Sequence, residues 1–73
     1  MSQVITNSAR EVLAKNLFKL RIKANLRKEE LSLLLGFDNS YISKLEKERI
    51  NITIDKLKKI ADYFETEPYK LIK

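Results

Sequence analysis

Four side chains between positions 40 and 47 have the types and the spacing that contacts with a nucleic-acid duplex require. At about 100° per residue, one face of a helix carries Ser40, Ser43, Lys44 and Lys47. Serine hydroxyls and lysine ammonium groups can hydrogen-bond to base edges and phosphate oxygens. Because two of the four side chains are short, the helix backbone can approach a partner closely. The alternative is a solvated helix face, which is the commoner explanation for a generic polar surface.

The residues around this face have the pattern of two short helices joined by a turn. Both helices, predicted near residues 28–35 and 39–47, show apolar residues at helical spacing. These residues are Leu31, Leu34 and Leu35 in the first helix, and Ile42 and Leu45 in the second. Gly36 is the only glycine and falls where the chain must reverse, in a conformation that costs glycine no strain. With Asp38 or Asn39 as a cap for the second helix, the segment is predicted to be a helix-turn-helix.

Three further helices are predicted in the rest of the chain, which shows no alternating strand pattern. Ser8 and Glu11 form a capping-box pattern for a helix from about residue 9 to about residue 24. Its apolar stripe consists of Leu13, Leu17, Leu20 and Ala24. Thr53 can cap a fourth helix, and Pro68 is suited to the first turn of a short fifth one. The apolar side of the fourth helix is formed by Leu57, Ile60, Ala61 and Phe64.

Length and composition limit the classes to which the chain can belong. Its 73 residues suit an N-terminal arm of residues 1–7 and a single domain of residues 8–73. With no cysteine and no histidine there is no disulfide and no usual zinc ligand, so no cofactor and no metal is predicted. No apolar run approaches about 20 residues and no signal-peptide pattern is present, so we expect a cytoplasmic protein without a membrane partner. The missing catalytic residue types also predict that the protein is not an enzyme.

The charge distribution favours an anionic partner. The chain has 15 basic and 10 acidic residues and a net charge of +5. Residues 1–26 hold five basic groups and a single acidic one, Glu11. Such an excess promotes encounters with polyanions and makes binding sensitive to salt. Charge alone is weak support for nucleic-acid binding, because many small domains are basic.

Several short motifs occur in order between residues 13 and 72. They are Leu17 with Arg21, L-x-x-E-E-L from Leu26 to Leu31, Gly36, Tyr41-Ile42-Ser43, Leu45-Glu46, and T-I-D-K-L-x-x-I-A from Thr53 to Ala61. In type and spacing the chain resembles the DNA-binding domains of the lambda-repressor and Cro type, also called the XRE family. Within that family, D-N-S-Y-I-S-K-L-E followed by N-I-T-I is most similar to restriction-modification controller proteins and to small phage or plasmid repressors. The resemblance implies an all-α, compact five-helix domain with a helix-turn-helix.

The resemblance also implies which side chains contact DNA. The start and outer face of the third helix would read bases, through Asn39, Ser40, Ser43 and Lys44. Asn39 suits an adenine edge or a phosphate, and Lys44 suits guanine acceptors. Phosphate contacts are implied for Lys28, Tyr41, Lys47, Arg49 and Asn51. The ring of Tyr41 could instead cover the edge of the core.

At two places the chain departs from the family pattern. Arg27 and Lys28 stand where relatives carry a serine or threonine cap followed by a glutamine that contacts DNA in several of them. A missing cap costs about 1 kcal/mol, although two added cations could strengthen phosphate binding. In the loop after Glu46, Glu48 and Ile50 stand where relatives often carry a glycine and a later arginine. We expect Glu48 to point away from DNA or to pair with a neighbouring Lys or Arg.

Two further sets of residues have structural assignments. Arg21 and Glu46 match a family pair that would orient the first and third helices, and this pair is expected to be structural. A homodimer is expected because one recognition helix covers only a few base pairs. Its interface is assigned to the apolar carboxyl-terminal residues Phe64, Tyr69, Leu71 and Ile72, of which Phe64 and Leu71 could instead be core.

Phe18 and Ile22 form an apolar pair with no family role, on the side of the first helix opposite its apolar stripe. Either Val4 and Ile5 fold back over them, or they form a patch for a protein partner.

Taken together, the motifs, the charge and the resemblance predict a transcription regulator that binds double-stranded DNA at a palindromic operator as a homodimer. The alternative is an antitoxin or adaptor whose main partner is a protein bound at Phe18 and Ile22.

Overall fold

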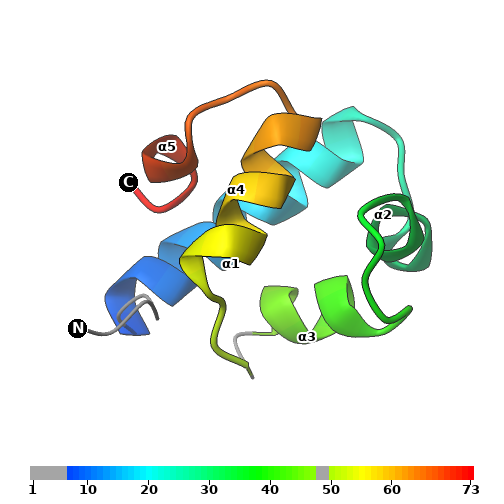
Figure 1. Cartoon of the computed structure of the whole chain (residues 1–73), viewed down its shortest axis with the longest axis horizontal. Coiled ribbons are helices and arrows are strands. Elements are labelled where there is room, and N and C mark those ends of the chain that lie inside the picture. Colours follow the sequence, from blue (N-terminus) through cyan, green and yellow to red (C-terminus); the bar gives the residue numbers. More distant parts are fainter. Residues whose placement is uncertain (1–6, 48–49) are drawn as a thin grey trace.

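The chain folds as a set of short helices around one long one (Figure 1). The computed structural model describes residues 7–47 and 50–73. Its helices are α1 (Asn7–Lys23), α2 (Lys28–Leu34), α3 (Tyr41–Glu46), α4 (Ile54–Tyr63) and α5 (Pro68–Leu71). The all-α, five-helix prediction is therefore confirmed. No helix in the described ranges is long and apolar enough to cross a bilayer.

The core is formed by the buried sides of all five helices. Its buried members are Leu13, Leu17, Leu31, Leu35, Ile42, Leu45, Ile52, Leu57, Ile60, Ala61 and Leu71. Two residues predicted to be buried are exposed. Leu34 is 58% exposed. Around the helix axis, the buried residues Leu31, Ser32 and Leu35 lie on one side, and Leu34 projects beyond the edge of that side. Ala24 is exposed because it follows the last residue of α1.

The helix ends follow the local signals at three places. Gly36 has a φ of 76°, in the left-handed region, and the backbone N–H of Phe37 then donates to the carbonyl of Ser32 at 2.8 Å. Thr53 caps α4, since its Oγ1 accepts a hydrogen bond from the backbone N–H of Lys56 at 3.3 Å. Pro68 is the first residue of α5. Each of these residues was expected in this role.

Other ends differ from the prediction. Because α1 begins at Asn7, Ser8 lies inside the helix and the predicted capping box is wrong. Helix α3 begins at Tyr41 rather than Asn39, and its N-terminal cap residue is Ser40 rather than the predicted Asp38 or Asn39. At the start of α2, Glu30 accepts a hydrogen bond from the backbone N–H of Arg27 at 2.8 Å, whereas a guanidinium cannot accept the reciprocal bond. The predicted loss of a side-chain cap at Arg27 thus agrees with the structure, and Glu30 offsets part of it.

Candidate nucleic-acid interface

The start of α3 is fixed to α2 by a buried serine. Ser32 is fully buried, and its Oγ accepts a hydrogen bond from the backbone N–H of Ile42 at 3.1 Å. The same hydroxyl donates to the carbonyl oxygen of Lys28 at 3.0 Å. An N–H group in the first turn of a helix has no partner within the helix, so this bond satisfies it and sets the angle between the two helices. The sequence reasoning missed Ser32. The available signal was a single polar residue on the buried side of an apolar helix.

The end of α3 is fixed to α1 by an ion pair. Arg21 Nε and Nη2 donate to the two carboxylate oxygens of Glu46 at 2.7 and 3.1 Å. Arg21 is only 6% exposed, and its Nη1 donates to the carbonyl oxygen of Leu26 at 2.8 Å. A two-pronged, nearly buried contact of this kind fixes orientation as well as distance. The structure therefore brings together the two residues that were expected to form a structural pair.

With both ends fixed, α3 presents its polar face outward. Ile42 and Leu45 are buried, while Asn39, Lys44 and Lys47 are exposed. Ser40 and Ser43 are half-buried. The predicted division between an inner apolar face and an outer polar face is therefore present in the structure.

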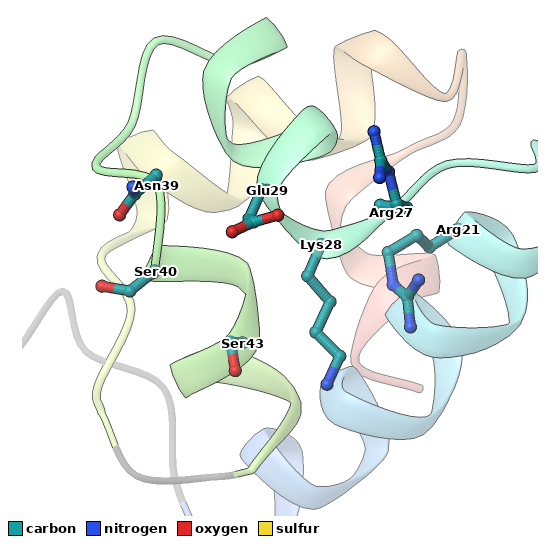
Figure 2. Close-up of a pocket in the computed structure, with 7 residues that line it drawn as sticks. All are labelled: Arg21, Arg27, Lys28, Glu29, Asn39, Ser40 and Ser43. Atoms are coloured by element: carbon teal, nitrogen blue, oxygen red, sulfur yellow. The ribbon is translucent and has the colours of Figure 1, made fainter.

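An open hollow of about 460 Å³ separates the polar face of α3 from the start of α2. Its lining residues are Arg21, Arg27, Lys28, Glu29, Asn39, Ser40 and Ser43. Figure 2 shows the three α3-side residues along one wall and the basic side chains along the other. Within the described residues, Arg21 pairs with Glu46 and Arg27 lies 3.6 Å from Glu30, whereas no ion pair involves Lys28. Lys28 is therefore the cation best placed to meet an anion in the hollow.

Ser40 has a more specific hydrogen-bonding role than its residue type indicates. Its Oγ donates to the Asp38 carboxylate at 2.6 Å, and its backbone N–H donates to the same oxygen at 3.2 Å. These two hydrogen bonds lower the pKa of Asp38 below its ordinary value of 3.8, and the bond from the Ser40 side chain has the larger effect. Asp38 is therefore ionised at neutral pH, and its carboxylate accepts the hydrogen bond that the Ser40 hydroxyl donates. Toward a bound partner, the Ser40 oxygen is then an acceptor, which suits an amino group on a base edge rather than a phosphate.

Tyr41 lies at the edge of the core. Its ring packs against Phe37, with 4.6 Å between the ring centres, and Lys56 Nζ lies 4.8 Å from the centre of the Tyr41 ring. Its hydroxyl is buried and has no hydrogen-bond partner among the described residues. Burial raises the pKa of Tyr41. This arrangement favours the alternative in which Tyr41 covers the core, and it does not present the hydroxyl to a phosphate.

The remaining assigned residues lie in the segment after α3 and at the carboxyl-terminal end. Lys47 and Asn51 are both exposed. Glu48 and Arg49, which stand between them in the sequence, lie outside the described ranges. At the carboxyl-terminal end, Tyr69 is 55% exposed and Phe64 and Ile72 are half-buried. Leu71 is 2% exposed, which makes it a core residue and removes it from the surface available to a partner.

Phe18 and Ile22 are both about half exposed, at 49% and 54%. They lie on α1, and the guanidinium of Arg21 lies 5.4 Å from the centre of the Phe18 ring. Val4 and Ile5, the residues predicted to cover them, lie outside the described ranges. A protein partner at this patch therefore stays a prediction.

Comparison with known families decides the class of this fold. A model of the helix-turn-helix family HTH_3 matches residues 17–71. The chain belongs to the HTH_3 family. The matched segment begins within α1 and ends at the last residue of α5, so it includes Arg21, Ser32 and Glu46, whose contacts hold α3 in place. The family resemblance that the sequence motifs indicated is confirmed.

Named relatives of this HTH_3 protein are transcription factors. A hypothetical transcription factor of Neisseria meningitidis serogroup B is 33% identical over 63 residues, which cover 86% of this chain. The chain spans 59% of the length of that relative. The relatives are regulators, in agreement with the prediction that this HTH_3 protein is not an enzyme.

Three crystal structures have the same fold. The hypothetical transcription factor NHTF from Neisseria matches with a TM-score of 0.84 and 28% identity, covering 100% of this chain and 85% of the other. The restriction-modification controller protein C.AhdI from Aeromonas hydrophila matches with a TM-score of 0.77 and 28% identity, covering 89% and 94%. An HTH_3 family transcriptional regulator from Vibrio cholerae, at 24% identity and a TM-score of 0.78, covers 90% and 38% and shows the fold alone.

Removing one partner of the Arg21 and Glu46 pair should destabilise the domain strongly. Arg21→Ala leaves the Glu46 carboxylate nearly buried without a counter-ion, and we expect the free energy of unfolding to fall by about 3–5 kcal/mol. The double variant Arg21→Met/Glu46→Leu removes both charges and keeps most of the volume, so it should recover a large part of this loss. Urea unfolding of the three proteins measures both effects. An Arg21→Ala variant with unchanged stability would show that the pair is not structural.

Proposed function

We propose that this protein binds double-stranded DNA by placing α3 in the major groove, and that it acts as a sequence-specific regulator of transcription. The observation that carries the proposal is the outward polar face of α3, which is held by contacts at both ends beside the basic start of α2. The major groove is about 12 Å wide and admits an α-helix, whose diameter with side chains is about 10–12 Å. The relatives named as transcription factors support the same function.

The two kinds of DNA contact fall to different residues. Asn39, Ser43 and Lys44 lie on the face that would meet base edges. The Ser40 hydroxyl donates to Asp38, so its oxygen would accept a hydrogen bond from a base there. Lys28 lines the hollow beside this face, and Lys47 directly follows the last residue of α3. From these positions the two lysines would meet the phosphate backbone and set the register of the helix. The ionised Asp38 carboxylate is next to Ser40, so a phosphate close to that end of α3 would be repelled.

We also propose that the DNA-binding unit is a homodimer on a palindromic operator. Two symmetric recognition helices about one turn of DNA apart would read two half-sites, which gives more specificity than a single helix of six residues can supply. The surface assigned to the partner subunit is Phe64, Tyr69 and Ile72, since Leu71 is core. The similarity to a restriction-modification controller protein supports a controller or phage-type repressor role.

Selection of duplexes from a random pool, followed by affinity measurements, tests the assignment of contacts. A palindrome should be recovered with the wild-type chain. Lys44→Ala should change the preferred base at one position of each half-site, at a cost of about 1–3 kcal/mol in discrimination. Lys47→Ala should weaken all sequences evenly and reduce the slope of affinity against salt by about 1. Lys58→Ala removes the same charge from an exposed position of α4, outside α3 and outside the proposed dimer surface, and is the matched control.

Equal losses over all sequences for both α3 variants would contradict this division. A pool in which no palindrome is enriched would contradict the symmetric dimer.

Tyr69→Ser should weaken the proposed dimer. The exposed Tyr69 ring would bury apolar surface only in the partner contact, so its loss should shift the sedimentation profile toward the monomer and lower affinity for the palindrome. Leu34→Ser removes a similarly exposed apolar side chain from α2 and should leave the oligomeric state unchanged. If the two variants sediment alike, the interface assignment is wrong.

A further inference from the structure

Arg10 connects α1 to the segment that follows the recognition helix. Its Nη1 donates a hydrogen bond to Oδ1 of Asn51 at 2.8 Å, across 41 positions of sequence. Figure 1 shows the yellow-green segment that leads into α4, from residue 50 on, at the same lower edge of the molecule as α3. Asn51 belongs to this segment, so its contact with Arg10 lies on the stretch of chain that leads from α3 to α4.

Asn51 is directed outward by its neighbours. Ile52 is buried and Ile50 is half-buried, while Asn51 between them is exposed. Ile52 belongs to the core and Ile50 packs against it, so the chain is anchored on both sides of Asn51. Asn51 thus has a fixed backbone, and Arg10 acts on the orientation of its amide group.

The hydrogen bond from Arg10 determines which end of that amide faces solvent. A guanidinium has donors only, so the end of the amide that contacts Arg10 must be the oxygen. The Nδ2 group, with two donors, is then directed away from Arg10. Phosphate oxygens are acceptors only, so an amide in this orientation suits the DNA backbone, whereas the reversed amide would present an acceptor to an acceptor.

We propose that Arg10 is a positioning residue for DNA-backbone recognition, because it holds the Asn51 amide with Nδ2 ready to donate to a phosphate oxygen. The inference rests on the proposed function and adds a residue of α1 to it. Its charge also lies next to the phosphate that Asn51 would contact, but the specific effect is on the amide.

A double-mutant cycle separates positioning from charge. Arg10→Met and Asn51→Ala should each weaken binding to the selected duplex by about fivefold, the value of one ordinary hydrogen bond. The matched control is Lys19→Met, which also removes an exposed positive charge from α1. The hydrogen-bond partner of Asn51 is Arg10 and not Lys19. In the Asn51→Ala background, Arg10→Met should cost no more than Lys19→Met does. Losses that simply multiply would overturn the inference.

Asn51→Asp gives a second test that does not require the loss of Arg10. The carboxylate should accept the Arg10 hydrogen bond more strongly, so the melting temperature should equal or exceed that of the wild type. The new carboxylate has no hydrogen-bond donor for a phosphate, and its negative charge repels the phosphate. The DNA affinity of Asn51→Asp should therefore fall below that of Asn51→Ala. An Asn51→Asp variant that binds DNA as well as Asn51→Ala would overturn the positioning role. A wild-type chain that binds no duplex would overturn the proposed function itself, and this inference with it.

Discussion

The candidate interface depends on a helix that is too short to be stable alone. Helix α3 has six residues, and isolated helices of fewer than about 12 residues are marginal in water. Its geometry therefore comes from its neighbours: Ser32 of α2 accepts the Ile42 N–H at its start, Arg21 of α1 pairs with Glu46 at its end, and the apolar face packs into the core between them. A rigid outward face follows from these three contacts together.

Much of the fold was predictable because its signals are local. The single glycine, the Thr53 cap and Pro68 each act through the conformation of their own segment, and the structure places all three as expected. The errors arose where a local pattern competes with tertiary packing. A serine followed by a glutamate matches a capping box at Ser8, but α1 starts earlier. Leu34 is apolar at helical spacing, but in a helix of two turns the buried side is narrow.

The site was predictable in its parts and not in its connections. The outward polar face of α3 follows from residue spacing, and the Arg21 and Glu46 pair followed from the family motif. Three features required the structure, because each joins residues far apart in sequence or decides between equal alternatives. These are the buried Ser32 bridge, the hydrogen bond of Arg10 to Asn51 across 41 positions, and the inward ring of Tyr41. A hydroxyl or an amide has several possible partners, and only the fold selects one.

Native-state hydrogen exchange of α3 tests most directly whether this helix is held by its neighbours. The backbone N–H groups of Lys44 and Lys47 donate to the carbonyl oxygens of Ser40 and Ser43, and that of Ile42 donates to the Ser32 hydroxyl. If the contacts at both ends fix the helix, these three amides should exchange only through global unfolding, with the same opening free energy as the amide of Leu17 in the core of α1. Exchange at Ile42, Lys44 and Lys47 that is orders of magnitude faster than at Leu17 would mean that α3 opens by itself, and would contradict a preformed recognition surface.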